Sequence, residues 1–208
     1  YYMDFLAIQC LYQTLVRFSA DHEIIGNLID SWEISNDRKT YKFHINEKSI
    51  FGNGTKVTSS DVIFSLTRHG WPSSKSIIKG YLNDHISGYK NLGENMTPSG
   101  LKKINDSSFE ITLNQPYAPF LYLLAMPGFS IVPKKDSDRL KLIGSGPFAV
   151  EKIDDRFIFK ANPLYKASSP LVNKLSIVTF SNAKNAKDAL VEKQIDVLLN
   201  LPYTQENI

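Results

Sequence analysis

Few side chains in this sequence have the types and spacing that catalysis or metal binding requires. The four histidines lie far apart, at His22, His44, His69 and His85. None of them forms the HxxxH or HExxH pair that would place two imidazoles on one zinc ion. Cys10 is the only cysteine, so one chain cannot build a disulfide framework or a cysteine-based zinc site. Asp84 next to His85 could polarise a nucleophile, but no GxSxG elbow supplies one. We expect no catalytic residue, no metal site, no cofactor and no enzyme activity.

The sequence GSGP at 144–147 has the glycine spacing of a phosphate-binding loop. Such a loop must open a helix, whose free backbone N–H groups meet the anion. Here a proline and a strand pattern follow instead. The favoured interpretation is a sharp bend where the chain passes between two layers, with phosphate binding as the weaker alternative.

Composition and charge describe a folded globular chain without an evident polyanionic partner. Of 208 residues, 42% are hydrophobic and 22% are charged, and 24 basic side chains stand against 21 acidic ones. Basic residues occur at most as adjacent pairs, so we expect no nucleic-acid partner. Residues 111–133 carry no charge, but Pro116, Pro119 and Pro127 would break the helical bonding that a bilayer demands. We therefore expect a buried strand-loop-helix passage there and no membrane span.

The elements before residue 142 read as helices and antiparallel hairpins. Apolar residues at three- and four-residue spacing predict an amphipathic helix from Phe5 to about Arg17. Alternation predicts one hairpin over 31–45 and a second over 101–113. The glycines of 51–55 predict a tight turn, and Thr58 with Asp61 has the spacing of a capping box that starts a helix. Residues 70–100 lose periodicity and predict a long irregular segment with short helical pieces.

The pattern changes near residue 142. Short strands at 147–150 and 157–160 are expected to pair antiparallel. A strand at 175–180, a helix around Ala186 and Ala189, and a strand at 195–199 predict a parallel pair with a right-handed crossover. The fold class is thus mixed α+β, with an antiparallel subdomain at 1–142 and the beginning of an α/β lobe at 143–208.

Several runs taken together resemble the family 5 extracellular solute-binding proteins, the receptors of dipeptide, oligopeptide and nickel ABC importers. The runs are LYQTLVRF (11–18), IIGNLIDSWEIS (24–35), TYKFHI (40–45), FGNGT (51–55), TSSDVIFS (58–65), PFL (119–121), IGSGPF (143–148) and IDV (195–197). They follow one order over nearly the whole chain. The resemblance implies a periplasmic-binding-protein-like fold of type II, cluster C, in which two lobes close on a ligand by hinge motion.

The resemblance also implies a function and partners. The chain is expected to belong to the substrate-binding component of an ABC importer, which captures a peptide or similar small solute and docks on the permease's transmembrane subunits. Its location would be periplasmic or extracellular and membrane-associated, with the export signal outside this chain. The alternative is a ligand-sensing domain of a transcriptional regulator with the same fold. Family members are usually more than twice as long, so the second lobe is expected to lie outside this chain, which is either an excised piece or a naturally short relative.

Site residues follow from the resemblance only by region. The segment after Pro-Phe-Leu and the irregular loop approach the ligand in such proteins. The implied ligand-binding residues are Trp71, Tyr81, Met126, Gly128, Phe129 and Ser130. For Phe129 the alternative is core packing, and for Trp71 and Tyr81 it is anchoring of the loop. The implied hinge is Gly144, Ser145 and Gly146. The absence of Arg or Lys between Gly128 and Ser130 argues against an anionic nickel chelate, so peptides are the expected ligands.

Overall fold

A computed structural model of the chain describes residues 2–135, 142–154, 156–166 and 170–199. A four-stranded antiparallel sheet forms its larger wall, in the order β3 (Ile29–Ile34), β4 (Thr40–Ile45), β6 (Ser108–Thr112) and β5 (Leu101–Lys103). Tyr41, Phe43 and Ile45 are all buried, which confirms that alternation places them on one face. Phe43 lies opposite Phe109 of β6, and their rings stack with centroids 5.1 Å apart. Both predicted hairpins are therefore confirmed.

Helix α2 (Ser59–Thr67) packs into the core of this sheet. Val62 and Leu66, from the apolar stripe of the helix, are fully buried. At its N-terminus the Asp61 carboxylate accepts the backbone N–H of Thr58 at 2.9 Å, as the capping spacing predicts. The second oxygen of Asp61 accepts the backbone N–H of Lys134 at 2.8 Å, so one carboxylate ties the helix start to a distant segment.

Short helices fill the space beside α2. They are α3 (Lys79–His85), α4 (Phe120–Leu124) and the 3₁₀ turn η1 (Pro127–Phe129). Residues 70–100 are otherwise irregular, as predicted. The uncharged stretch 111–133 is divided among a strand and short helices, and no helix in the described ranges is both long and apolar enough to cross a bilayer.

The first helix is shorter than its periodicity predicts. Helix α1 covers Tyr2–Leu11, and the chain then becomes the strand β1 (Val16–Phe18), which pairs antiparallel with β2 (Ile24–Gly26). The prediction of a helix to Arg17 is wrong. Backbone pairing with the returning strand overrides the helical spacing, because the carbonyl of Leu15 accepts the N–H groups of Asn27 and Leu28 at 3.0 and 3.2 Å.

A second, three-stranded sheet follows residue 142, in the order β7 (Phe148–Ile153), β8 (Arg156–Ala161) and β9 (Lys174–Val178). Its strands are all antiparallel, and the predicted pairing of β7 with β8 is confirmed. Helix α5 (Ala183–Val191) begins at Asn182, whose side chain accepts the N–H of Asn185 at 2.8 Å.

The predicted parallel strand at 195–199 is absent. After α5, Lys193 adopts a positive φ of 58°, and the N–H groups of Gln194 and Ile195 both bond to the carbonyl of Ala189. The chain thus turns back over the helix end, and Val197 remains 68% exposed. The run 195–199 pairs with no strand in the described ranges, so the predicted strand-helix-strand unit is corrected to an antiparallel sheet followed by one helix.

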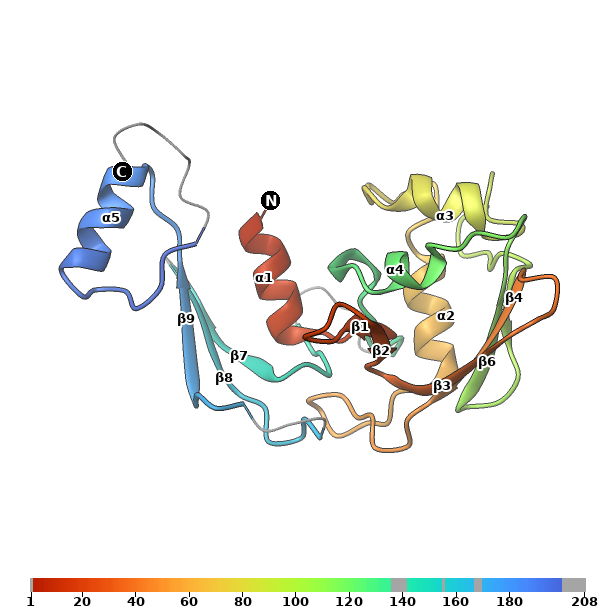
Figure 1. The fold of residues 1–208 in the computed structure, drawn as a ribbon, viewed down its shortest axis with the longest axis horizontal. Helices are drawn as coiled ribbons and strands as arrows, with labels where there is room; N and C mark the ends of the chain where they lie inside the picture. Colours follow the sequence, from red (N-terminus) through yellow and green to blue (C-terminus); the bar gives the residue numbers. More distant parts are fainter. Residues whose placement is uncertain (1, 136–141, 155, 167–169, 200–208) are drawn as a thin grey trace.

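Figure 1 shows the two sheets at opposite sides of the molecule, with α1 and the β1–β2 hairpin between them. Helix α1 contacts both β7 and η1, so the N-terminal helix packs against the second sheet although it precedes the first in sequence. The division of the chain near residue 142 remains a prediction, because α1 joins the two sides across it.

Candidate functional site

The larger of two adjacent cavities lies where the end of α1 meets the β1–β2 hairpin and η1. Its volume is about 300 Å³, at the lower end of the range for small-molecule pockets. The lining side chains come from segments far apart in sequence: Gln9, Tyr12, Gln13, Thr14, Arg17, Phe18, Asn27, Ala125, Pro127, Ser130, Pro147 and Tyr165. Aromatic rings and prolines thus alternate with amides, hydroxyls and one cation.

A network of polar side chains fixes the floor of this cavity. The Gln13 amide donates to the Asn27 side chain at 2.7 Å, and the Asn27 amide donates to the Thr14 hydroxyl at 3.3 Å. The Thr14 hydroxyl in turn donates to the carbonyl of Val16 at 2.6 Å. The backbone carbonyl of Gln13 accepts the N–H of Ile131 at 2.9 Å, which ties β1 to the segment after η1. These bonds hold the floor rigid while the amides keep further bonding capacity.

Arg17 is the only formally charged side chain among the residues that line this cavity. It forms no ion pair within the described part of the chain, and its Nη1 donates a long hydrogen bond of 3.4 Å to the carbonyl of Phe18. Burial raises the pKa of the nearby Tyr165 phenol, and the positive charge of Arg17 acts in the opposite direction. An unpaired guanidinium beside a phenol is suited to a carboxylate, which it can bind through two parallel hydrogen bonds.

The predicted residues after Pro-Phe-Leu divide into two groups. Ser130 lines the cavity, and its hydroxyl donates to the carbonyl of Pro127 at 2.7 Å. Met126 is 36% exposed and lies between two residues that line the cavity. Phe129, in contrast, is 1% exposed and belongs to the hydrophobic core, and a Cβ on Gly128 would lie 2.8 Å from the Ile78 side chain. Of the four, only Ser130 lines the cavity; Met126 adjoins lining residues in sequence, and Gly128 and Phe129 are packed against other side chains.

The structure does not bring Trp71 or Tyr81 to this cavity. The indole N–H of Trp71 donates to the carbonyl of Met96 at 3.1 Å, and its ring packs edge-on against Phe64 at 5.9 Å. That arrangement matches the alternative of loop anchoring. Tyr81 lies on α3 with 48% of its surface exposed. Ligand contact by either residue stays a prediction.

The proposed hinge residues lie in the passage between the two sheets. Gly144 accepts the N–H of Gly52 at 2.8 Å, and Gly146 donates to the carbonyl of Leu11 at 2.8 Å. The carbonyl of Gly146 also accepts the Asn162 amide at 2.8 Å. This is the sharp bend that the sequence predicts, held by hydrogen bonds from several segments, and hinge motion here is a proposal.

Four polar residues that line the cavity were not predicted from the sequence: Gln13, Arg17, Asn27 and Tyr165. The predicted helix through Arg17 concealed the first two. The usable signal was the β-branched Thr14 and Val16 together with the aromatic Phe18, at alternating positions, which favours a strand over a helix.

Comparison with known proteins assigns the family. A family model for bacterial extracellular solute-binding proteins, family 5, matches residues 23–208. This chain belongs to that family. The assignment confirms the resemblance, and the mixed fold with antiparallel sheets is that of periplasmic binding proteins.

Individual relatives of this family 5 chain are distant and considerably longer. The dipeptide-binding protein of Escherichia coli K12 is 29% identical, with 93% of this chain and 39% of that protein aligned. The periplasmic oligopeptide-binding protein OppA of Salmonella typhimurium LT2 is 25% identical, with 91% and 38% aligned. The structure of the E. coli murein tripeptide binding protein MppA superimposes with a TM-score of 0.84 at 20% identity, covering 92% of this chain and 40% of MppA. The chain therefore spans about two fifths of the length of the relatives it matches.

Within the described ranges, no group of three or more histidine, cysteine or carboxylate side chains is placed to hold a metal ion. The cavity donors are amides, hydroxyls and a guanidinium, which recognise anions and peptide groups better than cations.

Proposed function

We propose that this family 5 chain forms one wall of a ligand cleft that captures a short peptide or a similar small solute. The observation that carries the proposal is the 300 Å³ cavity whose lining combines the guanidinium of Arg17, side-chain amides and aromatic rings. A short peptide offers matching groups: a carboxylate for the guanidinium, N–H and C=O groups for Gln13 and Asn27, and apolar side chains for Tyr12 and Phe18. The similarity to a dipeptide-binding and an oligopeptide-binding protein supports the same ligand class.

The mechanism we propose is capture without covalent change. A ligand that contacts this wall and an opposite lobe is bound better by the closed state, so it shifts the open-closed equilibrium toward closure. The passage at Gly144–Gly146 is the proposed hinge. The closed form would then deliver the solute to the transmembrane subunits of an ABC permease, at the outer surface of the membrane or in the periplasm.

Native mass spectrometry of the protein at its natural length, purified without denaturation, tests this proposal. We expect a second set of peaks whose mass excess matches short peptides and disappears after unfolding and refolding. Calorimetric titration of the refolded protein with di- and tripeptides should then restore saturable binding. The proposal is contradicted if the refolded protein binds neither the peptides nor the solute that was released from it on unfolding.

A further inference from the structure

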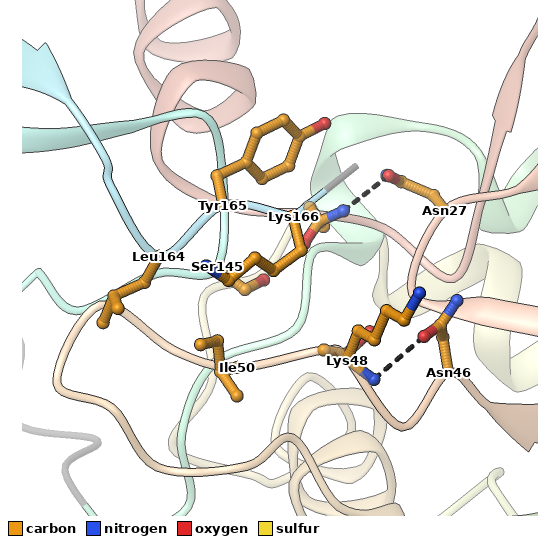
Figure 2. A pocket seen from close by; sticks show the side chains of 10 residues that line it. Asn27, Asn46, Lys48, Ile50, Ser145, Leu164, Tyr165 and Lys166 are labelled. Carbon is orange, nitrogen blue, oxygen red and sulfur yellow. Dashed lines mark hydrogen bonds between the residues drawn. The ribbon is translucent and has the colours of Figure 1, made fainter. Parts of the chain in front are cut away.

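A second pocket of about 60 Å³ adjoins the larger cavity and shares Gln13, Asn27 and Tyr165 with it. Its remaining walls come from the segment 46–50, from Ser145 and from residues 164–166, so it lies where the two sides of the molecule meet (Figure 2). A single water needs only about 10–15 Å³ measured in this way. The pocket therefore has room for a small polyatomic group.

The charge around this pocket has one sign. Lys48 and Lys166 line it, and no aspartate or glutamate does. Neither lysine forms an ion pair within the ranges that the structure describes. Figure 2 shows Lys166 on the Tyr165 and Ser145 side of the pocket and Lys48 on the Asn46 side. Two unneutralised ammonium groups around one pocket favour an anion.

Ser145 adds a buried donor at the same place. The residue is only 1% exposed, and its Oγ atom has no hydrogen-bond partner in the described structure. A buried hydroxyl left without a hydrogen-bond partner is destabilising, so a partner is expected. The backbone on both sides of Ser145 is fixed by the bonds of Gly144 to Gly52 and of Gly146 to Leu11, so the chain is held while its hydroxyl lines the pocket.

We infer that this pocket binds a small oxyanion of the phosphate type, held by Ser145 Oγ and the ammonium groups of Lys48 and Lys166. A water molecule would also satisfy the hydroxyl, but only an anion would in addition interact favourably with the two exposed ammonium groups, and these groups disfavour a metal cation. The GSGP sequence takes part through the side chain of its serine, with no helix N-terminus involved. The inference does not depend on the proposed peptide binding.

Binding here joins segments that are otherwise separate. Lys48 follows β4, Ser145 precedes β7, and Lys166 follows β8. An anion that contacts all three stabilises the junction between the two sheets, and any ligand that binds only the folded state raises the unfolding temperature. The expected signature is stabilisation that saturates with phosphate concentration and exceeds the effect of ionic strength.

The test is thermal unfolding of the natural-length protein in increasing inorganic phosphate, with sodium chloride adjusted to keep ionic strength constant. At about ten times the dissociation constant, we expect the midpoint to rise by about 3 °C if about 200 residues unfold together, and by about 1 °C if a chain as long as the relatives does. Lys48→Gln, Lys166→Gln and Ser145→Ala should each raise the phosphate dissociation constant about tenfold, the loss typical of one charge-assisted bond. Ser145→Ala removes an unpaired group and should fold at least as well as the parent.

Two control variants separate this pocket from other sites. Lys90→Gln removes an exposed lysine from the 70–100 segment and should leave the phosphate effect unchanged. Arg17→Gln changes the larger cavity and should also leave it unchanged. The inference is overturned if phosphate stabilises no more than chloride, if all lysine variants respond alike, or if Arg17→Gln abolishes the effect.

Discussion

The backbone N–H of Gly146 donates to the carbonyl oxygen of Leu11 across 2.8 Å, so the passage into β7 lies directly against the last residue of α1. This contact joins the N-terminal helix to the second sheet. It also places Ser145 and Pro147 beside the two cavities, which lie between the two sides of the molecule.

The close approach of the two backbones predicts that Gly144 cannot be replaced. A Cβ at this position would clash with the Leu11 carbonyl oxygen, which belongs to the backbone and cannot rotate away. We expect Gly144→Ala to lower the free energy of unfolding by about 3 kcal/mol, measured by urea denaturation. Gly80→Ala is the matched control, because its Cβ meets nothing within 4 Å. In helix α3 that control should be neutral or stabilising by up to about 1 kcal/mol. Equal losses in both variants would contradict the close packing.

The bonds of Asp61 predict a larger effect than an ordinary helix cap gives. Asp61→Ala leaves the N–H groups of Thr58 and Lys134 without their acceptor. We expect a loss of about 2–3 kcal/mol in the free energy of unfolding. Asp21→Ala, at an exposed position, should stay within about 0.5 kcal/mol. A loss for Asp61→Ala no larger than that of the control would show that the carboxylate does not join these segments.

The burial of His69 predicts a pH-dependent stability. Burial, assisted by the charge of Arg68, lowers the pKa of His69 from 6.5 to about 3 in the folded state. The unfolded chain therefore binds more protons between these values. This contribution is complete above pH 6.5 and is lost as pH falls toward 3, by at most about 1.4 kcal/mol per pH unit. In the His69→Gln variant, the free energy of unfolding should therefore change less with pH between 3 and 6.5 than it does in the parent.

The matched control for this measurement is His22→Asn. His22 is exposed and has a positive φ of 61°, which asparagine tolerates. This variant should reproduce the parent profile in urea denaturation from pH 4 to 7. A parent and a His69→Gln curve that run parallel would contradict the assignment.

Arg17 predicts a dependence on the ligand's carboxylate. In the natural-length protein, Arg17→Gln should weaken binding of a short peptide about tenfold, as expected for one charge-assisted contact. Amidation of the peptide's C-terminus should weaken binding to the parent by a similar factor. In the Arg17→Gln variant, amidation should change the peptide dissociation constant very little. Calorimetric titration of both proteins with both peptides completes the double cycle. Arg38→Gln, in the β3–β4 turn, is the control and should bind as the parent does. If the losses from Arg17→Gln and from amidation add up, the peptide carboxylate does not bind to Arg17.

Local patterns in the sequence predicted local structure well. Alternation fixed the β3–β4 and β5–β6 hairpins, since each needs only neighbouring residues to pair. The Thr58-to-Asp61 spacing located the start of α2, and the glycines of 144–146 indicated a bend. The mixed fold followed from these elements.

Pairings with distant partners were not visible in the sequence. Whether residues 12–17 continue a helix depends on residues 24–28, whose strand takes up the backbone bonds. Whether 195–199 forms a strand depends on backbone pairing with another strand, which does not occur in the described ranges. The cavity residues Arg17 and Tyr165 come from opposite ends of the chain, so neither local pattern revealed that they meet.

Photolabelling tests most directly whether the ligand binds in the 300 Å³ cavity. A dipeptide with a diazirine side chain would be bound to the natural-length protein, irradiated, and mapped by mass spectrometry after proteolysis. We predict labelling within residues 9–18 and 125–130 that unlabelled dipeptide suppresses. Labelling confined to the segment that contains Trp71 and Tyr81, or labelling that the competitor does not suppress, would contradict the account.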